Sequence, residues 1–184
     1  MNLKFYQLDV FTNRPLGGNP LAVFPDPGDI TDGQMQALAR EMNLSETTFV
    51  FPSENATRKI RFFTPMAEIP LAVHPTIGTW WLLAELGLID VPTQGNLRIT
   101  QETGAAVLPV DIFLEDGKPT RVVMTQTAPE FGASLKNSDL LAAALGGSAT
   151  AVRSQPAPQI VSTMIGTMCS TSVAGLTAHG EATS

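Results

Sequence analysis

The sequence is poor in the residues that build metal sites and covalent cross-links. Its 184 residues include one cysteine, Cys169, and two histidines, His74 and His179. A single cysteine excludes an internal disulfide and any thiol pair built from one copy of the chain. Two histidines without a cluster of further ligands do not favour a zinc site. We therefore expect a protein that depends on neither a metal nor a disulfide.

Excess positive charge and long apolar runs are missing as well. Eleven Lys and Arg residues against 17 Asp and Glu give a net charge of −6, so the chain has no general attraction for nucleic acid or anionic membranes. No stretch approaches the length of a membrane span, and the N-terminal sequence MNLKFYQLDVF lacks the apolar region of a signal peptide. We expect a cytoplasmic protein with neither nucleic acid nor a membrane as its partner.

Strand-like apolar patterns are present along much of the chain. The hydrophobic share of 43% can form a sizeable core, in one large domain or two small lobes. Strands are predicted at residues 3–11, 21–24, 47–51, 59–64, 97–101, 106–114, 121–127 and 156–162. Helices are few, and no glycine-rich phosphate loop joins a strand to a helix, which disfavours a doubly wound nucleotide-binding sheet. The pattern indicates an α+β architecture.

Two helices carry the clearest signals. Residues 31–42 begin with Thr31 and Gln34 at the spacing of a capping box, and the residues that follow have apolar side chains at helical spacing. A second helix is predicted from Pro75 to about Gly87, and its apolar residues point in most directions around the axis. We expect this second helix to be buried, with its tryptophans in the core. A short third helix is predicted at residues 140–145.

Glu46 and His74 are the main candidates for chemistry. Glu46 lies between the first helix and an apolar strand, where a partly buried carboxylate can serve as a general base; the alternative is a solvated loop acid. His74 lies at the start of the apolar helix, where free amides and the helix dipole favour an anion such as a substrate carboxylate. Its alternative role is a core histidine bonded to a backbone carbonyl. The residues alone leave these alternatives open.

Three further polar or small residues share this ambiguity. Thr76 can donate its hydroxyl to an anion or simply occupy the first helical turn, and Gly78 can admit a ligand or another backbone. Asn19, in the GGNP loop, can bind a ligand or hold a turn, and the turn is the more common role. Cys169 has no base or cation next to it in the sequence, which favours a bystander role over that of a nucleophile.

Several segments, in order and at consistent spacing, carry a family resemblance. These are LDVFTNRPLGGNPLAVF, MQALAREMNLSETTFVF, IRFFTPMAEIPLAVHPTIGT and, more weakly, PQIVST. Together they resemble the phenazine-biosynthesis, PhzF-like family of the diaminopimelate-epimerase-like fold, densely over about the first 130 residues. The resemblance implies lobes made of a curved, mostly antiparallel sheet around a central helix, with the active site in a cleft between two lobes. We expect residues 1–128 to form the N-terminal lobe and residues 129–184 a partial, atypical C-terminal lobe.

The resemblance also implies an activity. Family members are cofactor-independent isomerases or epimerase-like proteins that act on small carboxylic acids, with dihydro-hydroxyanthranilate isomerisation the best known case. The glutamate of the NLSE motif matches Glu46, which would take a proton from carbon and return it elsewhere on the substrate. The histidine of the family's GHPT motif matches His74, which would assist substrate binding or proton handling.

The remaining candidate residues are then assigned to substrate binding. Backbone amides near Thr76 and Ile77, at the helix start, would hold a carboxylate and stabilise the charge that develops on deprotonation. Gly78 and Asn19 complete this group of residues.

The chain departs from the family pattern at three points. Val73 stands where the family usually has a glycine, and Met164 follows VST where another glycine is usual. The chain also ends at Ser184, before the Asp and the ATGSA-like segment that complete the second lobe in the family. These departures support a second hypothesis, a truncated and non-catalytic binding or interaction protein whose exposed surface is covered by a partner or a second copy. A homodimer is expected under both hypotheses.

Overall fold

The computed structural model describes residues 3–126, which contain one mixed sheet and two helices. The strands are β1 (Tyr6–Val10), β2 (Asn19–Phe24), β3 (Glu46–Phe51), β4 (Arg58–Phe63), β5 (Glu68–Ile69), β6 (Gly95–Glu102), β7 (Val107–Glu115) and β8 (Lys118–Met124), and the helices are α1 (Asp32–Met42) and α2 (Val73–Glu85). The helix predicted at residues 140–145, the strand predicted at 156–162 and the proposed division after residue 128 lie outside the described residues, as do Cys169, His179 and Met164.

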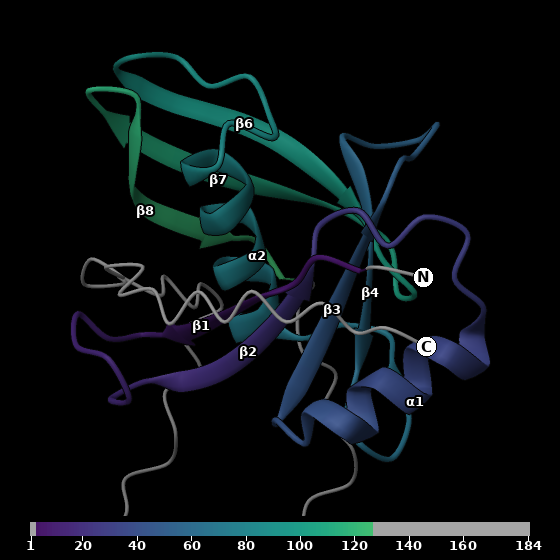
Figure 1. The fold of residues 1–184 in the computed structure, drawn as a ribbon. Helices are drawn as coiled ribbons and strands as arrows, with labels where there is room; N and C mark the ends of the chain where they lie inside the picture. The colour runs from purple at the N-terminus through teal and green to yellow at the C-terminus, as the bar shows by residue number, and fades with distance from the viewer. Residues whose placement is uncertain (1–2, 127–184) are drawn as a thin grey trace, which may run out of the picture. The chain divides into compact units, whose positions relative to one another are not determined.

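The sheet is mostly antiparallel, as predicted. Its strands follow the order β1-β2-β3-β4-β6-β7-β8, with the short β5 beside β4. Two neighbouring pairs, β2 with β3 and β4 with β6, are parallel, and the others are antiparallel. Because β2 and β3 are parallel and α1 connects them, both strands begin at the same end of the sheet (Figure 1). That end carries Asn19 and Glu46, the first residues of the two strands.

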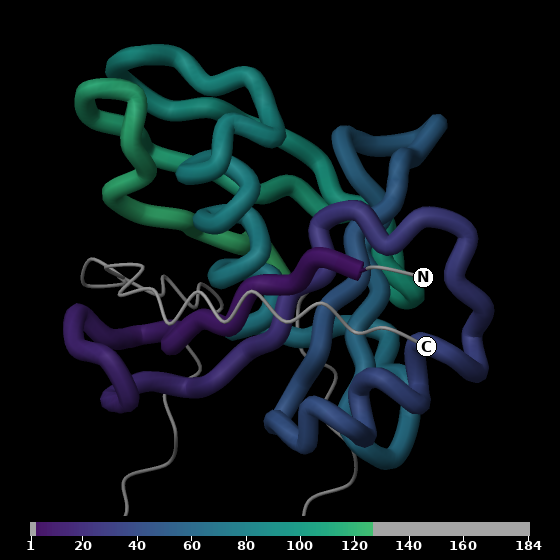
Figure 2. The backbone as a smooth tube through the Cα atoms, viewed as in Figure 1, coloured from purple at the N-terminus to yellow at the C-terminus, as the bar shows by residue number. Residues whose placement is uncertain are grey.

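Helix α2 is the central helix of this curved sheet. It contacts β8 from one end of the sheet and β1, β2 and β3 from the other, so the strands lie around it (Figures 1 and 2). Eleven of its 13 residues are buried, among them Trp80 and Trp81, which confirms the predicted buried helix and the core position of both tryptophans. The apolar composition on all sides follows from this enclosure, because between His74 and Ala84 no face of the helix meets water.

Helix α2 begins earlier than predicted, at Val73 instead of Pro75. Its N-cap is Ala72, whose backbone is extended (φ −145°, ψ 139°). Pro75 is then the third helical residue, a position where a missing amide hydrogen still costs no helical bond. His74 therefore belongs to the first turn of the helix.

Helix α1 lies on the other face of the sheet and contacts β3 and β4. The predicted capping box is confirmed, because the Thr31 hydroxyl accepts from the Gln34 amide while the Gln34 side chain accepts from the Thr31 amide. The helix packs on an aromatic cluster formed by Phe24, Phe49 and Phe63. Neither helix in the described part of the chain has the length and apolarity needed to cross a membrane.

Candidate active site

Glu46 is placed by the pairing of β2 with β3. In this parallel register Glu46 lies opposite Leu21, next to the start of β2. The hydroxyl of Ser45 donates to Asn19 Oδ1 at 3.0 Å, which ties the residue before Glu46 to the first residue of β2. Asn19 and Glu46, both candidates from the sequence, are thus brought to one end of the sheet. The hydrogen bond also gives Asn19 a structural task there.

His74 meets Glu46 at this end of the sheet. The distance from His74 Nε2 to Glu46 Oε2 is 3.2 Å, and the two side chains are only 9% and 19% exposed. Neither atom has a hydrogen-bond partner of proper geometry within the described residues, so the two groups are in contact without being aligned for a hydrogen bond. A carboxylate and an imidazole whose facing atoms are close, buried and without another hydrogen-bond partner are suited to proton transfer with a third molecule.

The environment of His74 favours its neutral form. Burial lowers the pKa of the imidazole below its ordinary value of 6.5, while the charge of Glu46 and the backbone of Pro20 act in the opposite direction. Burial is the largest of the three effects, because charging the ring requires removing a cation from water. Near neutral pH the pair therefore consists of a neutral ring beside a carboxyl group.

The N-terminus of α2 adds a site for negative charge. Ala72 offers no side chain to cap the helix, and Pro75 has no amide hydrogen. Thr76 is the first residue whose amide donates within the helix, to the Ala72 carbonyl at 3.3 Å. The amides of Val73 and His74 precede this bond and belong to the open first turn, where the positive end of the helix dipole attracts an anion.

Thr76, Ile77 and Gly78 lie deeper than the sequence suggested. Thr76 is fully buried, and its hydroxyl donates to the Ala72 carbonyl at 2.7 Å. Ile77 is 3% exposed and forms part of the hydrophobic core around α2. Gly78 faces β1 and β2, where an added Cβ would lie 2.7 Å from Val10 Cγ2 and 2.8 Å from Leu21 Cδ2. The side chains of Thr76 and Ile77 and the backbone of Gly78 therefore pack in the interior, close behind the open helix end.

Phe11 is a residue near this site that the sequence did not single out. The sequence predicts Phe11 as the last residue of the first strand, but β1 ends at Val10 and Phe11 has a left-handed backbone (φ 67°). Its ring centroid lies 6.4 Å from that of His74, and the residue is 49% exposed. Bulky residues rarely adopt positive φ, and such strain is often found at functional sites. The signal for Phe11 is this backbone angle, which the sequence does not reveal.

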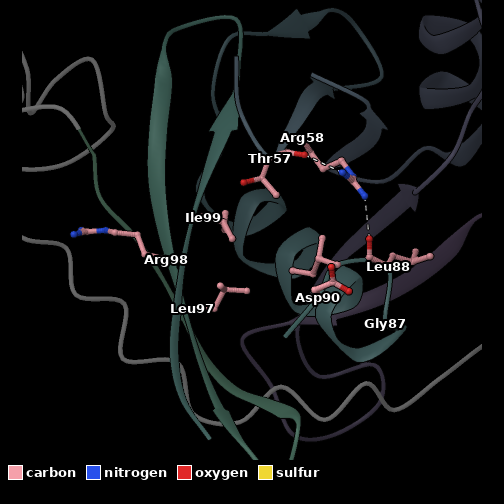
Figure 3. Close-up of a pocket in the computed structure, with 9 residues that line it drawn as sticks. Thr57, Arg58, Gly87, Leu88, Asp90, Leu97, Arg98 and Ile99 are labelled. Atoms are coloured by element: carbon pink, nitrogen blue, oxygen red, sulfur yellow. Dashed lines mark hydrogen bonds between the residues drawn. The ribbon is translucent and has the colours of Figure 1, made fainter. Parts of the chain in front are cut away.

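A pocket of about 460 Å³ lies at the opposite end of α2. It is lined by residues of the segment after α2, of β6 and of the start of β4, including Arg58, Leu88, Asp90, Leu97 and Ile99 (Figure 3). The Arg58 guanidinium lines this pocket and donates to the carbonyls of Thr57 and Leu88 at 2.9 and 3.0 Å. These donors are engaged within the protein, and the pocket contains neither Glu46 nor His74. No group of three potential metal ligands occurs within residues 3–126.

Comparisons with known proteins show which sequences the chain resembles. The family model described as "Phenazine biosynthesis-like protein" matches residues 8–173. The trans-2,3-dihydro-3-hydroxyanthranilate isomerase of Pseudomonas aeruginosa is 38% identical over 141 residues, which cover 76% of this chain and 48% of that protein. The chain spans about half the length of the curated relatives it matches.

Solved structures show the same relationship. A crystal structure of a Bacillus anthracis phenazine biosynthesis protein of the PhzF family matches with a TM-score of 0.69 and 34% identity, over 82% of this chain and 49% of that one. A probable proline racemase from Agrobacterium radiobacter matches with a TM-score of 0.56 and 16% identity, over 68% of this chain and 42% of that one. The second match is a likeness of fold alone. Together they confirm the predicted α+β fold of the epimerase-like class.

Proposed function

Since the chain belongs to the phenazine biosynthesis-like protein family, we propose that it takes part in shifting a proton on a small carboxylic acid, without a cofactor, with Glu46 as the acid/base. The observation that carries this proposal is the contact of 3.2 Å between Glu46 Oε2 and His74 Nε2 at the open end of α2. A catalytic carboxylate must be within reach of the carbon-bound proton and must be partly shielded from water. Glu46, at 19% side-chain exposure, meets the second requirement.

The proposed steps assign one task to each group. The substrate carboxylate binds at the first turn of α2, where the amides of Val73 and His74 and the helix dipole neutralise its charge. Glu46 removes a proton from a carbon next to a C=C bond of the substrate; the electron pair left behind forms a new C=C bond, while the existing double bond shifts its electron pair to its far carbon. The protonated Glu46 then returns the proton to a different carbon, so that no electrons are gained or lost. We place the carboxylate on Val73 and His74 because the Thr76 amide already donates to Ala72.

The neutral ring of His74 supports this assignment. A protonated imidazole at 3.2 Å would hold Glu46 in a tight ion pair and weaken it as a base, whereas a neutral ring leaves the carboxylate free to act. We assign His74 to substrate binding and proton handling. Asn19, held by Ser45 beside Glu46, is assigned to the substrate-binding edge of the site.

Solvent exchange tests the proposal directly. The 184-residue protein is incubated in D₂O with trans-2,3-dihydro-3-hydroxyanthranilate and with a set of small cyclic and α-amino carboxylic acids, and deuterium incorporation is followed by NMR. We expect incorporation into at least one acid, with a loss of at least about 100-fold in Glu46→Gln, the usual effect of removing a general base. Glu41→Gln, which changes an exposed carboxylate of α1, is the matched control. Equal incorporation by Glu46→Gln and wild type, or none with any acid, would contradict the proposal.

A second candidate function, a non-catalytic binding protein that pairs with another copy of itself, is favoured by exposed apolar side chains. Phe11 and Val73 are 49% and 39% exposed, and Leu16, in the same loop as Phe11, is 80% exposed. We propose a homodimer that covers this surface, since large exposed apolar residues near one another favour association. Light scattering should then give twice the chain mass for wild type and a smaller mass for Leu16→Glu. A monomeric wild type would argue against the dimer. A cytoplasmic location stays a prediction from the sequence.

A further inference from the structure

A buried chain of hydrogen bonds connects β6 to the first turn of α2. Trp80 Nε1 donates to Gln101 Oε1 at 2.9 Å, Gln101 Nε2 donates to Thr76 Oγ1 at 3.4 Å, and Thr76 Oγ1 donates to the Ala72 carbonyl at 2.7 Å. Trp80, Gln101 and Thr76 are each 0% exposed. The chain therefore runs through the core and ends on the N-cap residue of the helix that carries His74.

Gln101 is an unusual residue for this position. A fully buried amide loses its hydration, and it is tolerated only where its hydrogen bonds are replaced. A Gln that served only to accept from the Trp80 indole would leave its own amide group without a partner. Here the amide group is directed to Thr76, so the side chain joins two points of α2 that lie about one turn apart.

The first turn of α2 is the part of the helix that most needs such support. It has no capping side chain, and its open amides face the place where we propose that a carboxylate binds. The Ala72 carbonyl is held both by the Thr76 amide at 3.3 Å and by the Thr76 hydroxyl at 2.7 Å. Because the orientation of Ala72 fixes where the helix starts, Ala72 also fixes the positions of the next two residues, Val73 and His74.

We propose that Gln101 is a positioning residue, which holds the first turn of α2 through Thr76 and so keeps His74 in contact with Glu46. Gln101 reaches the first turn from β6 through the core, which leaves the open amides of Val73 and His74 free for a ligand. The functional meaning of this role rests on the function proposed above for His74. The geometric role does not, because it is tested on the protein without substrate.

The experiment compares variants that remove one link each. Gln101→Met keeps the length of the side chain and removes both of its hydrogen bonds, and Thr76→Val removes the hydroxyl with little change in volume. Thr76→Ser keeps the hydroxyl and should behave as wild type. Ile112→Val is the control for a general loss of core packing, because Ile112 is a fully buried residue of β7 outside this network.

The first readout is amide hydrogen exchange of Thr76 relative to that of Val110, which lies in β7. A general loss of stability speeds both amides equally, whereas a loosened first turn speeds Thr76 alone. We expect the Thr76 to Val110 ratio to rise roughly three- to tenfold in Gln101→Met and in Thr76→Val, the change that one neutral hydrogen bond supplies. Ile112→Val and Thr76→Ser should leave the ratio unchanged. An unchanged ratio in Thr76→Val would overturn the proposal.

The second readout is the His74 ring. The sequence has only two histidines, so His179→Gln assigns the ring signals in a proton NMR spectrum. In Gln101→Met the pKa of His74 should move up toward its ordinary value as the turn admits water, and in Ile112→Val it should not move. The double variant Gln101→Met/Thr76→Val should shift the pKa no further than either single variant, because both break one chain of contacts. If Gln101→Met does not fold, Thr76→Val alone decides. A His74 pKa that changes equally in Thr76→Val and Ile112→Val would count against the role of Gln101.

Discussion

Gly78 is a residue at which α2 packs closely against β1 and β2, and replacing it with alanine tests how the helix is placed. A Cβ at this position would lie 2.7 Å from Val10 Cγ2 and 2.8 Å from Leu21 Cδ2. Carbon atoms in contact are ordinarily at least ~3.5 Å apart, so the helix or the two side chains must move by about 0.8 Å. Val10 and Leu21 are 1% and 0% exposed, and such tightly packed neighbours have little room to move.

The expected energy follows from two opposing effects. Overpacking of a filled core costs about 1–3 kcal/mol, and replacing glycine with alanine in a helix returns up to about 1 kcal/mol. We expect Gly78→Ala to lower the free energy of unfolding by about 1 kcal/mol. Gly33 in α1 is the matched control, because a Cβ there meets nothing within 4 Å and only the favourable helical effect remains. The two variants should therefore differ by about 1–2 kcal/mol, with opposite signs relative to wild type.

Urea unfolding followed by circular dichroism measures this difference. Gly78→Val adds two further carbon atoms and should be worse than Gly78→Ala. His74 lies one turn before Gly78 on the same side of α2, so lifting the helix from β2 should also disturb the ring signal of His74. Equal stability of Gly78→Ala and Gly33→Ala would show that the close approach of α2 to β1 and β2 does not constrain the helix.

Two further predictions concern His74 and Phe11. Burial holds the pKa of His74 below 6.5, so the neutral ring stabilises the fold fully above that pH and this contribution is lost as the pH falls from 6.5 toward the lowered pKa. Urea unfolding at several pH values between about 5 and 8 should show a loss of stability on acidification that is smaller in His74→Gln than in wild type. Identical profiles of stability against pH for the two proteins would refute this prediction. Phe11 has a φ of 67°, so Phe11→Gly should be more stable than Phe11→Ala by about 1 kcal/mol in thermal unfolding, since both lose the ring and only glycine adopts this angle without strain. A Phe11→Ala variant more stable than Phe11→Gly would contradict backbone strain at Phe11.

The local features of the fold could be predicted from the sequence because each depends on neighbouring residues. The capping box of Thr31 and Gln34 is a contact over three positions, and the structure forms it as predicted. The burial of α2 follows from its all-round apolar composition, which has no stable place on a surface. The hairpin turn between β7 and β8 follows from Asp116 and Gly117, both of which take positive φ values there.

The meeting of Glu46 and His74 could not be predicted from spacing alone. It depends on the parallel register that places Glu46 opposite Leu21, and on Gly78, which lets α2 approach that strand. Both are contacts between distant parts of the chain, and neither has a local signal. The family resemblance named the two residues, but their separation of 3.2 Å is a property of the folded sheet.

Val73 shows how the structure changes the meaning of a sequence difference. A glycine at this position in the family suggests a backbone that only glycine adopts, yet Val73 is the first residue of α2 and is not among the residues with positive φ. Valine is therefore accommodated without backbone strain. In a helix each Cβ points toward the N-terminus, so the side chain of Val73, 39% exposed, is directed toward the open end where we propose that a carboxylate binds. The substitution therefore acts on the space in front of the helix, where Val73 and the Phe11 ring, 6.4 Å from the His74 ring, place apolar surface beside the proposed binding site.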